Sequence, residues 1–196
     1  NYLSEITKDS SNMIVPSEMI KNNEVLRMLK PFGYNSVHFS SGWRATDRNR
    51  FADLNIYCGR NNDFNTIFTM TTMLRPLENS YLQKSTRERI LCTFERLAGI
   101  KNKVNGPVFV FAHIVSPHPP YVFGENGEFI NDPKLSKAND FSAWQNREAY
   151  LNQLKFINKK TEELTEKLLS DRDELPIIII QADHGPASTP GMEEYN

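Results

Sequence analysis

Residues 107–114 of this chain read Pro-Val-Phe-Val-Phe-Ala-His-Ile, and this stretch decides the fold class. Nearly every side chain in it is apolar, which is typical of a strand that is covered on both faces of a parallel sheet. A second apolar run, Ile177–Ile180, follows Pro176 directly. We therefore expect both runs to be strands of one mainly parallel sheet, with Ile177–Ile180 as a central strand.

Helix signals precede each of these strands. Asn23 can cap a helix over residues 24–30, which Pro31 and Gly33 would end, and residues 34–39 then read as a short strand. The order predicts an α/β domain, because a helix between two strands is the usual way to return a chain to a parallel sheet.

Two longer helices are expected further along the chain. Ser85 and Glu88 fit a capping box for a helix that ends at Gly99, and the last helix is expected from about Ser142 to Leu169. The apolar residues of the last helix that we expect to be buried are Tyr150, Leu151, Leu154, Ile157, Leu164 and Leu168. The fold class is therefore α/β, with a mainly parallel sheet flanked by helices.

Composition and charge exclude some classes of partner. The chain has 196 residues, of which 39% are hydrophobic, and its formal net charge is −1 from 23 basic and 24 acidic residues. With so small a net charge, no overall electrostatic field attracts nucleic acid or an anionic membrane.

No stretch approaches the ~18 consecutive apolar residues that span a bilayer. The chain opens with Asn1 rather than Met, so we expect part of the natural protein to precede it.

The two cysteines, Cys58 and Cys92, can either pair or stay free. Their spacing is not that of metal ligands, and the interpretation we favour is that both are small buried hydrophobic residues.

Asp183, His184 and Gly185 directly follow the isoleucine run. Ligands of open α/β sheets bind outside the carboxyl ends of the strands, where the flexible Gly185 lets the carboxylate and the imidazole converge on one ion. That pair of ligands suits Zn²⁺ or Mn²⁺ better than Ca²⁺. The alternative is a polar turn in which Asp183 caps the following backbone and His184 is solvated.

His118 lies between prolines after the other apolar strand. Prolines restrict the backbone, so the imidazole would be a pre-organised donor to a substrate oxygen. A stiff surface loop explains the same pattern equally well. His113 and His38 lie on expected strands, where we interpret them as structural histidines.

Arg44, Arg48 and Arg50 lie in a polar stretch that also holds Asp47. Guanidinium groups can bind an anion as forks. The interpretation we favour is that these arginines are solvated or paired with Asp47 and Asp53.

Taken in order, these segments resemble the sulfatase-like branch of the alkaline phosphatase superfamily. The segments that carry the resemblance are Phe111–His113, Pro117–Tyr121, Tyr150–Asn152, Ile177–Ile180 and Asp183–Gly185, with residues 29–34, 40–43 and 64–74 in the front half. The likeness covers most of the chain, and the ordered set is much more specific than Asp-His-Gly alone.

The resemblance implies a metal-dependent hydrolase or transferase that acts on sulfate or phosphate esters. By matching positions, Asp183 and His184 look like metal ligands, and His118 looks like the histidine that contacts the anionic group of the substrate. Members of this branch include lipoteichoic acid synthases and phosphoethanolamine transferases, which are anchored in a membrane with the catalytic domain outside the cytoplasm. The resemblance therefore implies a periplasmic or extracellular domain, anchored through a segment outside this chain.

The departures from the family pattern limit this expectation. In the family, an acidic metal ligand and a Thr or Ser nucleophile come earlier and further strands come later, so we expect residues 1–196 to be a partial catalytic domain. The nucleophile is expected before Asn1. This chain alone should then be inactive, bind a divalent ion weakly or not at all, and self-associate through an exposed sheet edge. The alternative function is a non-catalytic binding module with the same fold.

Overall fold

The structure is a computed structural model that describes residues 14–59, 68, 71–73, 78–132, 135, 145–170, 175–182 and 185, and of residues 78–82 it describes the backbone. The chain divides into two compact units, which we describe separately. The first comprises Asn1–Cys58 and Gly99–Val115, and the second comprises Gly59–Ala98 and Ser116–Asn196.

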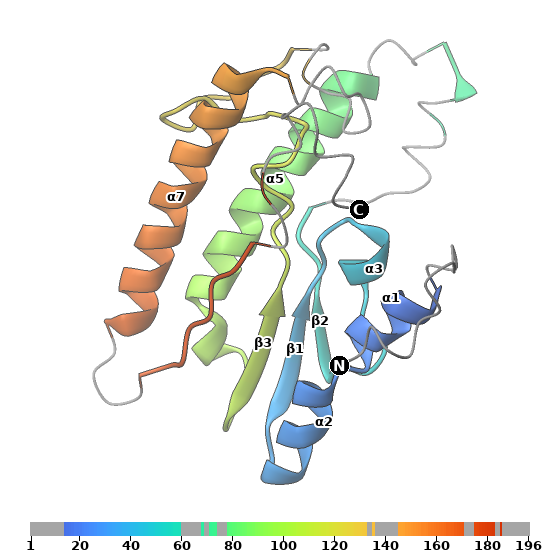
Figure 1. The fold of residues 1–196 in the computed structure, drawn as a ribbon, viewed down its shortest axis with the longest axis vertical. Helices are drawn as coiled ribbons and strands as arrows, with labels where there is room; N and C mark the ends of the chain where they lie inside the picture. Colours follow the sequence, from blue (N-terminus) through green and yellow to red (C-terminus); the bar gives the residue numbers. More distant parts are fainter. Residues whose placement is uncertain are drawn as a thin grey trace. The chain divides into compact units, whose positions relative to one another are not determined.

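The first unit contains a parallel sheet of three strands (Figure 1). Strand β1, Asn35–Phe39, lies between β2, Leu54–Ile56, and β3, Val108–Ala112. Val37 at the middle of β1 is opposite Leu54 on one side and Val110 on the other. The prediction of an α/β fold with a parallel sheet is confirmed, and so are the strands expected at residues 34–39 and 107–114. Strand β2 was not predicted.

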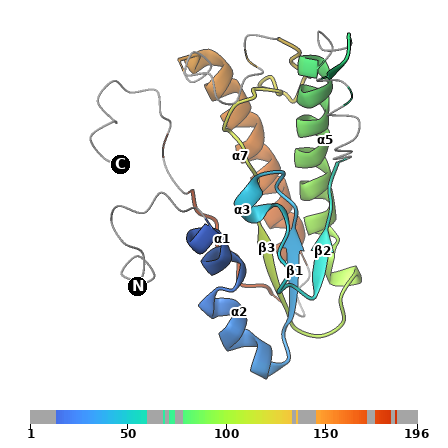
Figure 2. The same ribbon diagram turned by 90° about the vertical axis from the view of Figure 1, so that its right-hand side faces the viewer.

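Two short helices cover one face of this sheet. They are α1, Ile14–Lys21, and α2, Glu24–Leu29 (Figure 2). Ile20 of α1 and Leu26 of α2 line a small cavity together with Phe111 of β3, so the helices pack on the apolar side chains of the strands.

The ends of α2 follow the signals in the sequence. The Asn23 side chain accepts a hydrogen bond from the Leu26 N–H at 2.9 Å, as an N-cap residue does. The short 3₁₀ helix η2, Lys30–Phe32, continues the chain to Gly33, which has a φ of 80°. Glycine adopts that left-handed conformation without steric cost, so the helix stops where we expected.

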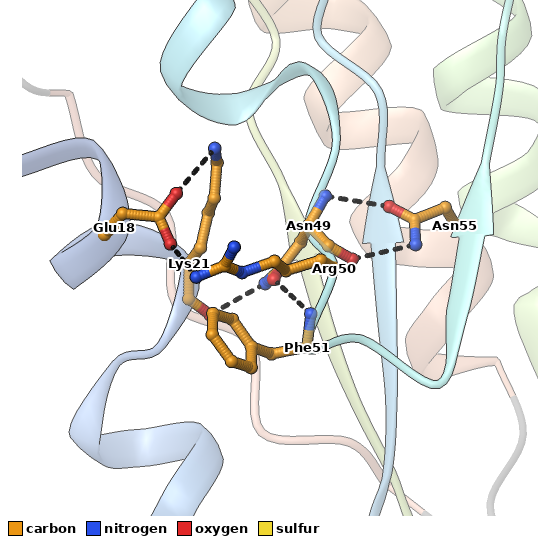
Figure 3. Close-up of polar contacts among 6 residues, drawn as sticks. All are labelled: Glu18, Lys21, Asn49, Arg50, Phe51 and Asn55. Atoms are coloured by element: carbon orange, nitrogen blue, oxygen red, sulfur yellow. Dashed lines mark hydrogen bonds and ion pairs between the residues drawn. The ribbon is translucent and has the colours of Figure 1, made fainter. Parts of the chain in front are cut away.

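Asn49 fixes the segment that leads into β2 (Figure 3). Its buried side chain donates to the Lys21 carbonyl and accepts from the Phe51 N–H, each at 2.9 Å. The Asn55 side chain in turn accepts from the Asn49 N–H and donates to the Asn49 carbonyl, also at 2.9 Å. The sequence showed a polar stretch here. In the structure, the Asn49 and Asn55 side chains supply the partners that backbone groups need when they leave water.

Arg50 is exposed, as the solvated alternative predicted, and it also pairs with an acidic residue that we did not expect. Its guanidinium lies 2.8 Å from the Glu18 carboxylate and 4.9 Å from the centre of the Phe51 ring (Figure 3). Arg50 is therefore paired with a residue of α1 rather than with Asp47 or Asp53. Because the side chain of Arg50 is 69% exposed, this ion pair contributes at most about 1 kcal/mol.

The second unit contains the two long helices, α5, Glu78–Ala98, and α7, Arg147–Leu169, which pack against each other (Figure 2). Helix α5 ends before Gly99, as predicted, but it already begins at Glu78. The expected capping box at Ser85 is therefore wrong, because Ser85 lies inside the helix. Helix α7 begins later than expected, where the Asn146 side chain accepts from the Ala149 N–H at 3.0 Å.

The run Ile177–Ile180 is not a strand. Residues 175–182 form neither helix nor strand, and Ile177, Ile179 and Ile180 are 94%, 81% and 66% exposed. The prediction of a central strand is therefore wrong for this structure. β-Branched residues favour extended backbone, but a strand also needs a neighbouring strand to satisfy its N–H and C=O groups.

Both cysteines are disulfide-bonded, although Cys58 is as buried as we expected. Of the two alternatives that the sequence left open, the structure therefore has the paired state, and our favoured interpretation of both cysteines as simple buried hydrophobic residues is corrected. Among the described residues, no helix combines the length and the apolar character that crossing a membrane requires.

Candidate functional site

Of the site residues predicted from the sequence, His118 belongs to the described part of the structure. Asp183 and His184 lie outside the described residues, so their expected convergence on an ion stays a prediction. Among the described residues, no group of three or more His, Cys, Asp or Glu side chains is arranged to hold a metal ion.

His118 lies in the second unit, on a proline-rich loop whose peptide bonds Ser116–Pro117 and Pro119–Pro120 are cis. Its half-buried ring donates from Nδ1 to the carbonyl of Pro119. A neutral imidazole that donates from Nδ1 carries its lone pair on Nε2, so this contact selects one tautomer. Pro119 is fully buried, which anchors the loop beside the histidine.

The polypeptide that follows His118 is packed tightly into the second unit. Tyr121, Val122 and Phe123 are 0% exposed. The ring of Tyr121 lies edge-on to Tyr150 of α7, with 6.5 Å between the ring centres. Burial raises the pKa of the Tyr121 hydroxyl to about 12, so this phenol stays neutral at physiological pH.

Phe123 is enclosed by side chains from both long helices. Its ring centre lies 4.6 Å from that of Phe156 on α7, and the Arg87 guanidinium of α5 lies 5.5 Å from the same ring. Gly127 sits where a Cβ would collide with the Phe156 ring, and its φ of 88° is in the left-handed region. Only glycine fits that position, so the hairpin-like loop after Phe123 closes directly over helix α7.

Gln153 of α7 makes the polar contacts to this loop. Its Oε1 accepts from the N–H groups of Val122 at 2.8 Å and Phe123 at 3.3 Å. Its Nε2 donates to the carbonyls of His118 at 3.3 Å and Pro120 at 3.5 Å. The helix thus holds the main chain on both sides of Tyr121, including the backbone of His118 itself.

Our sequence analysis missed Gln153, because it placed only apolar residues on the buried side of the last helix. In the structure, the buried residues of α7 are Ala149, Gln153 and Ile157. Leu151, which we expected to be buried, is 38% exposed. The spacing did contain a signal: Gln153 is four residues from both Ala149 and Ile157, and a polar residue on a buried helix stripe needs hydrogen-bond partners.

A second polar cluster lies in the first unit, at the carboxyl ends of β1 and β3. His113 directly follows β3, and its Nδ1 is 2.7 Å from the Thr46 hydroxyl. The same hydroxyl is 2.8 Å from the hydroxyl of Ser41, two residues after β1. Helix α3, Arg44–Asp47, brings Thr46 to this position. Both serine and threonine hydroxyls are therefore used to hold the end of the sheet.

His38 supports the same cluster from inside β1. It is 2% exposed, donates from Nε2 to the Thr46 carbonyl at 2.8 Å and stacks on Phe111 with 5.4 Å between ring centres. Burial lowers the pKa of His38, because desolvation disfavours the imidazolium. The contacts of His38 and His113 are those of structural histidines, as we interpreted them.

The turn between β1 and α3 is built around Asp47. Its carboxylate accepts from the Gly42 N–H at 2.9 Å and from the Ser40 hydroxyl. Trp43 projects from this turn, 46% exposed, with its ring edge-on to His113 at 5.9 Å. Asp47 therefore caps the turn, and Arg44 and Arg48 are exposed, which agrees with the solvated alternative of our interpretation.

The chain was also compared with known proteins. Comparison with curated proteins and with solved structures finds no match. The model of one family, described as Sulfatase, matches residues 2–195. That family consists of hydrolases, generally uses a divalent metal, and its members are often extracellular or periplasmic. Since the match spans nearly the whole chain, the chain belongs to the sulfatase family.

Proposed function

We propose that this chain forms part of a metal-dependent enzyme that cleaves sulfate or phosphate esters, by hydrolysis or by transfer to an acceptor. The observation that carries the proposal is the sulfatase family match over residues 2–195. Sulfate esters are the first substrates to test, because the family supports a hydrolase of that class.

In this proposal, His118 contacts the anionic group of the ester. Two features of the loop support that role. The prolines and the buried Pro119 restrain the backbone, and the contact from Nδ1 to the Pro119 carbonyl orients the ring. A group that is held before the substrate arrives loses less entropy on binding, so it stabilises a developing charge more effectively.

Asp183 and His184 would hold the divalent ion. A carboxylate oxygen and an imidazole nitrogen fit Zn²⁺ or Mn²⁺ better than Ca²⁺, which prefers a larger set of oxygen ligands. When bound, such an ion polarises an ester oxygen and lowers the pKa of a hydroxyl nucleophile. No nucleophile is assigned among residues 1–196.

We further propose that the protein works outside the cytoplasm, in the periplasm or the extracellular space, anchored to a membrane through a segment outside this chain. The disulfide-bonded state of Cys58 and Cys92 supports this location, since disulfides persist in oxidising compartments. The proposed partner is an anionic ester substrate, with no role for nucleic acid.

Calorimetry with Mn²⁺ and Zn²⁺ on the natural full-length protein tests the metal site, with Asp183→Asn and His184→Gln as variants. We expect each variant to weaken binding by more than about 100-fold, because even outer-sphere residues of metal sites account for 10–100-fold. Glu163→Gln is the control: this carboxylate pairs with Lys160 at 2.6 Å and its side chain is 47% exposed, so its loss should leave metal binding unchanged.

Turnover of p-nitrophenyl sulfate and p-nitrophenyl phosphate by the same proteins tests the reaction. The proposal predicts metal-dependent release of p-nitrophenol, which chelation abolishes and metal restores. If the full-length protein binds no divalent ion and cleaves neither ester, the enzyme proposal is wrong. A non-catalytic binding module with the sulfatase fold would then be the better account.

A further inference from the structure

We propose that Gln153 is a positioning residue for His118, acting through the main chain of residues 118–123. The inference rests on the proposed function, in which His118 contacts the anionic group of the substrate. It concerns only the second unit, where both residues lie.

The first argument is that the Gln153 amide is used to its full capacity. A glutamine side chain offers two N–H donors and two acceptor lone pairs. Gln153 makes two acceptor contacts, at 2.8 and 3.3 Å, and two donor contacts, at 3.3 and 3.5 Å. All four contacts go to backbone groups of the His118 loop. The Gln153 side chain therefore gives this loop hydrogen bonds of the kind that a neighbouring strand would give.

The second argument is that the loop has few donors of its own. Proline has no N–H, and three of the four residues 117–120 are prolines. This segment therefore cannot be held by the regular backbone ladder that fixes a strand. The carbonyls of His118 and Pro120 still need donors, and Gln153 supplies them from the rigid surface of α7.

The third argument is burial. Gln153 is 0% exposed, so its amide competes with no water for these contacts. An apolar side chain of similar volume would leave the loop carbonyls and N–H groups inside the protein without those partners. The loop would then have to move to reach water, and His118 would move with it.

The experiment compares two variants at this position with a matched control. Gln153→Met keeps the volume and removes all four contacts. Gln153→Glu keeps the acceptor and replaces the donor by a carboxylate that repels the two carbonyls. The control is Gln83→Met, because Gln83 is also a fully buried glutamine of the second unit, but it donates to the Asp132 carbonyl at 2.9 Å.

The first readout does not depend on activity. In the full-length protein labelled with ¹⁵N-histidine, the ring signals of His118 are assigned by their loss in His118→Ala. We expect these signals to shift or multiply in both Gln153 variants and to stay in place in Gln83→Met. The ring signals of His38 and His113 should not change in any of them. Unchanged His118 signals in a folded Gln153→Met protein would overturn the inference.

The second readout is a double-mutant cycle on p-nitrophenyl sulfate. We expect Gln153→Met to lower kcat/KM by about 10- to 100-fold, the effect of a misplacement near 1 Å. Adding Gln153→Met to His118→Ala should then cause no further loss, because Gln153 acts through His118. Fully additive losses would show that Gln153 supports the fold in general, and would refute the positioning role.

The two readouts separate this inference from the proposed function. If His118→Ala turns over the ester normally while the His118 signals respond to Gln153→Met, the role of His118 is wrong but the positioning is right. If His118→Ala is inactive and the His118 signals do not change in Gln153→Met, the proposed role of His118 is right but the positioning role of Gln153 is wrong. Gln153→Glu provides a second folded variant if Gln153→Met does not fold.

Discussion

His113 and His118 are five residues apart in the sequence, yet the structure holds them by different means. His113 lies at the carboxyl end of strand β3, and its ring is hydrogen-bonded through Nδ1 to the Thr46 hydroxyl. His118 lies on a proline-rich loop, where Gln153 holds the main chain and the Nδ1 contact goes to a neighbouring carbonyl. In the first case the side chain is part of the structural network, whereas in the second the network holds the backbone.

The contacts of His113 belong to the fold of the first unit, whereas the role of His118 in substrate binding is our proposal. A ring whose nitrogen is bonded to a distant side chain contributes to stability, and moving it breaks that contact. The backbone of His118 has its own hydrogen bond from Gln153, so the position of this residue does not depend on its ring alone. Functional groups are most effective when the surrounding structure holds them in place before the substrate binds.

The largest effect is expected from replacing each histidine by alanine in the full-length protein. His118→Ala should lower kcat/KM for p-nitrophenyl sulfate by about 100-fold, because a hydrogen bond to a charged group contributes about 1.5–3 kcal/mol. Its free energy of unfolding should change little. His113→Ala should do the opposite, losing about 2 kcal/mol of stability with a much smaller loss of activity. Steady-state kinetics and urea denaturation of both proteins measure these effects. A loss of stability in His118→Ala and a loss of activity in His113→Ala would contradict the distinction between the two histidines.

The next effect concerns the hydroxyl that holds His113. Thr46→Val should lower the free energy of unfolding by about 2 kcal/mol, since it removes this partner from the buried Ser41 hydroxyl and from the half-buried His113 ring. The matched control is Thr93→Val: Thr93 is 4% exposed, like Thr46, but its hydroxyl donates to the Arg89 carbonyl four residues earlier in its own helix. That change should cost less than about 1 kcal/mol. Equal losses of unfolding free energy in the two variants, measured by urea denaturation, would show that the contacts of Thr46 stabilise the protein no more than an ordinary helix hydroxyl does.

The smallest effect is expected at the opposite end of β1. The Asp53 carboxylate accepts from the Ser36 N–H at 2.9 Å and its hydroxyl at 2.7 Å, and pairs with Lys30 at 3.1 Å. These contacts, led by the backbone bond from Ser36, lower the pKa of Asp53 from 3.8 to about 2. Asp53→Asn should therefore destabilise the protein, but only by about 1 kcal/mol, because the Asp53 side chain is 39% exposed and solvent screens it.

The sign of the pH dependence follows from that lowered pKa. The unfolded chain binds a proton at Asp53 more readily than the folded chain does, so the stabilisation is fully present above pH 3.8. It is lost as the pH falls through about 2. Urea denaturation of the wild type and Asp53→Asn should differ at pH 6 and converge near pH 2. A difference that stays constant over this range would contradict the assignment.

Local signals in the sequence determined several parts of this protein. The cap at Asn23, the stop at Gly33 and the end of α5 before Gly99 depend on residues close together in the chain, and each was predicted correctly. The strand at residues 107–114 was also predicted, because its composition fits a covered strand. The ordered motifs gave the sulfatase-like resemblance that the family match then confirmed.

Other features were decided only by the tertiary structure. Ile177–Ile180 has the composition of a strand but is exposed, because strand formation depends on a neighbour that the local sequence does not specify. The capping box at Ser85 is overridden by a helix that starts earlier. The buried amides of Asn49 and Gln153 form hydrogen bonds with backbone groups of other segments. The residues next to Asn49 and Gln153 in the sequence do not identify those backbone groups. The residues near a position in the sequence determine its propensity for helix or strand. The hydrogen-bond partners of a buried polar group, in contrast, lie on segments that only the tertiary structure brings together.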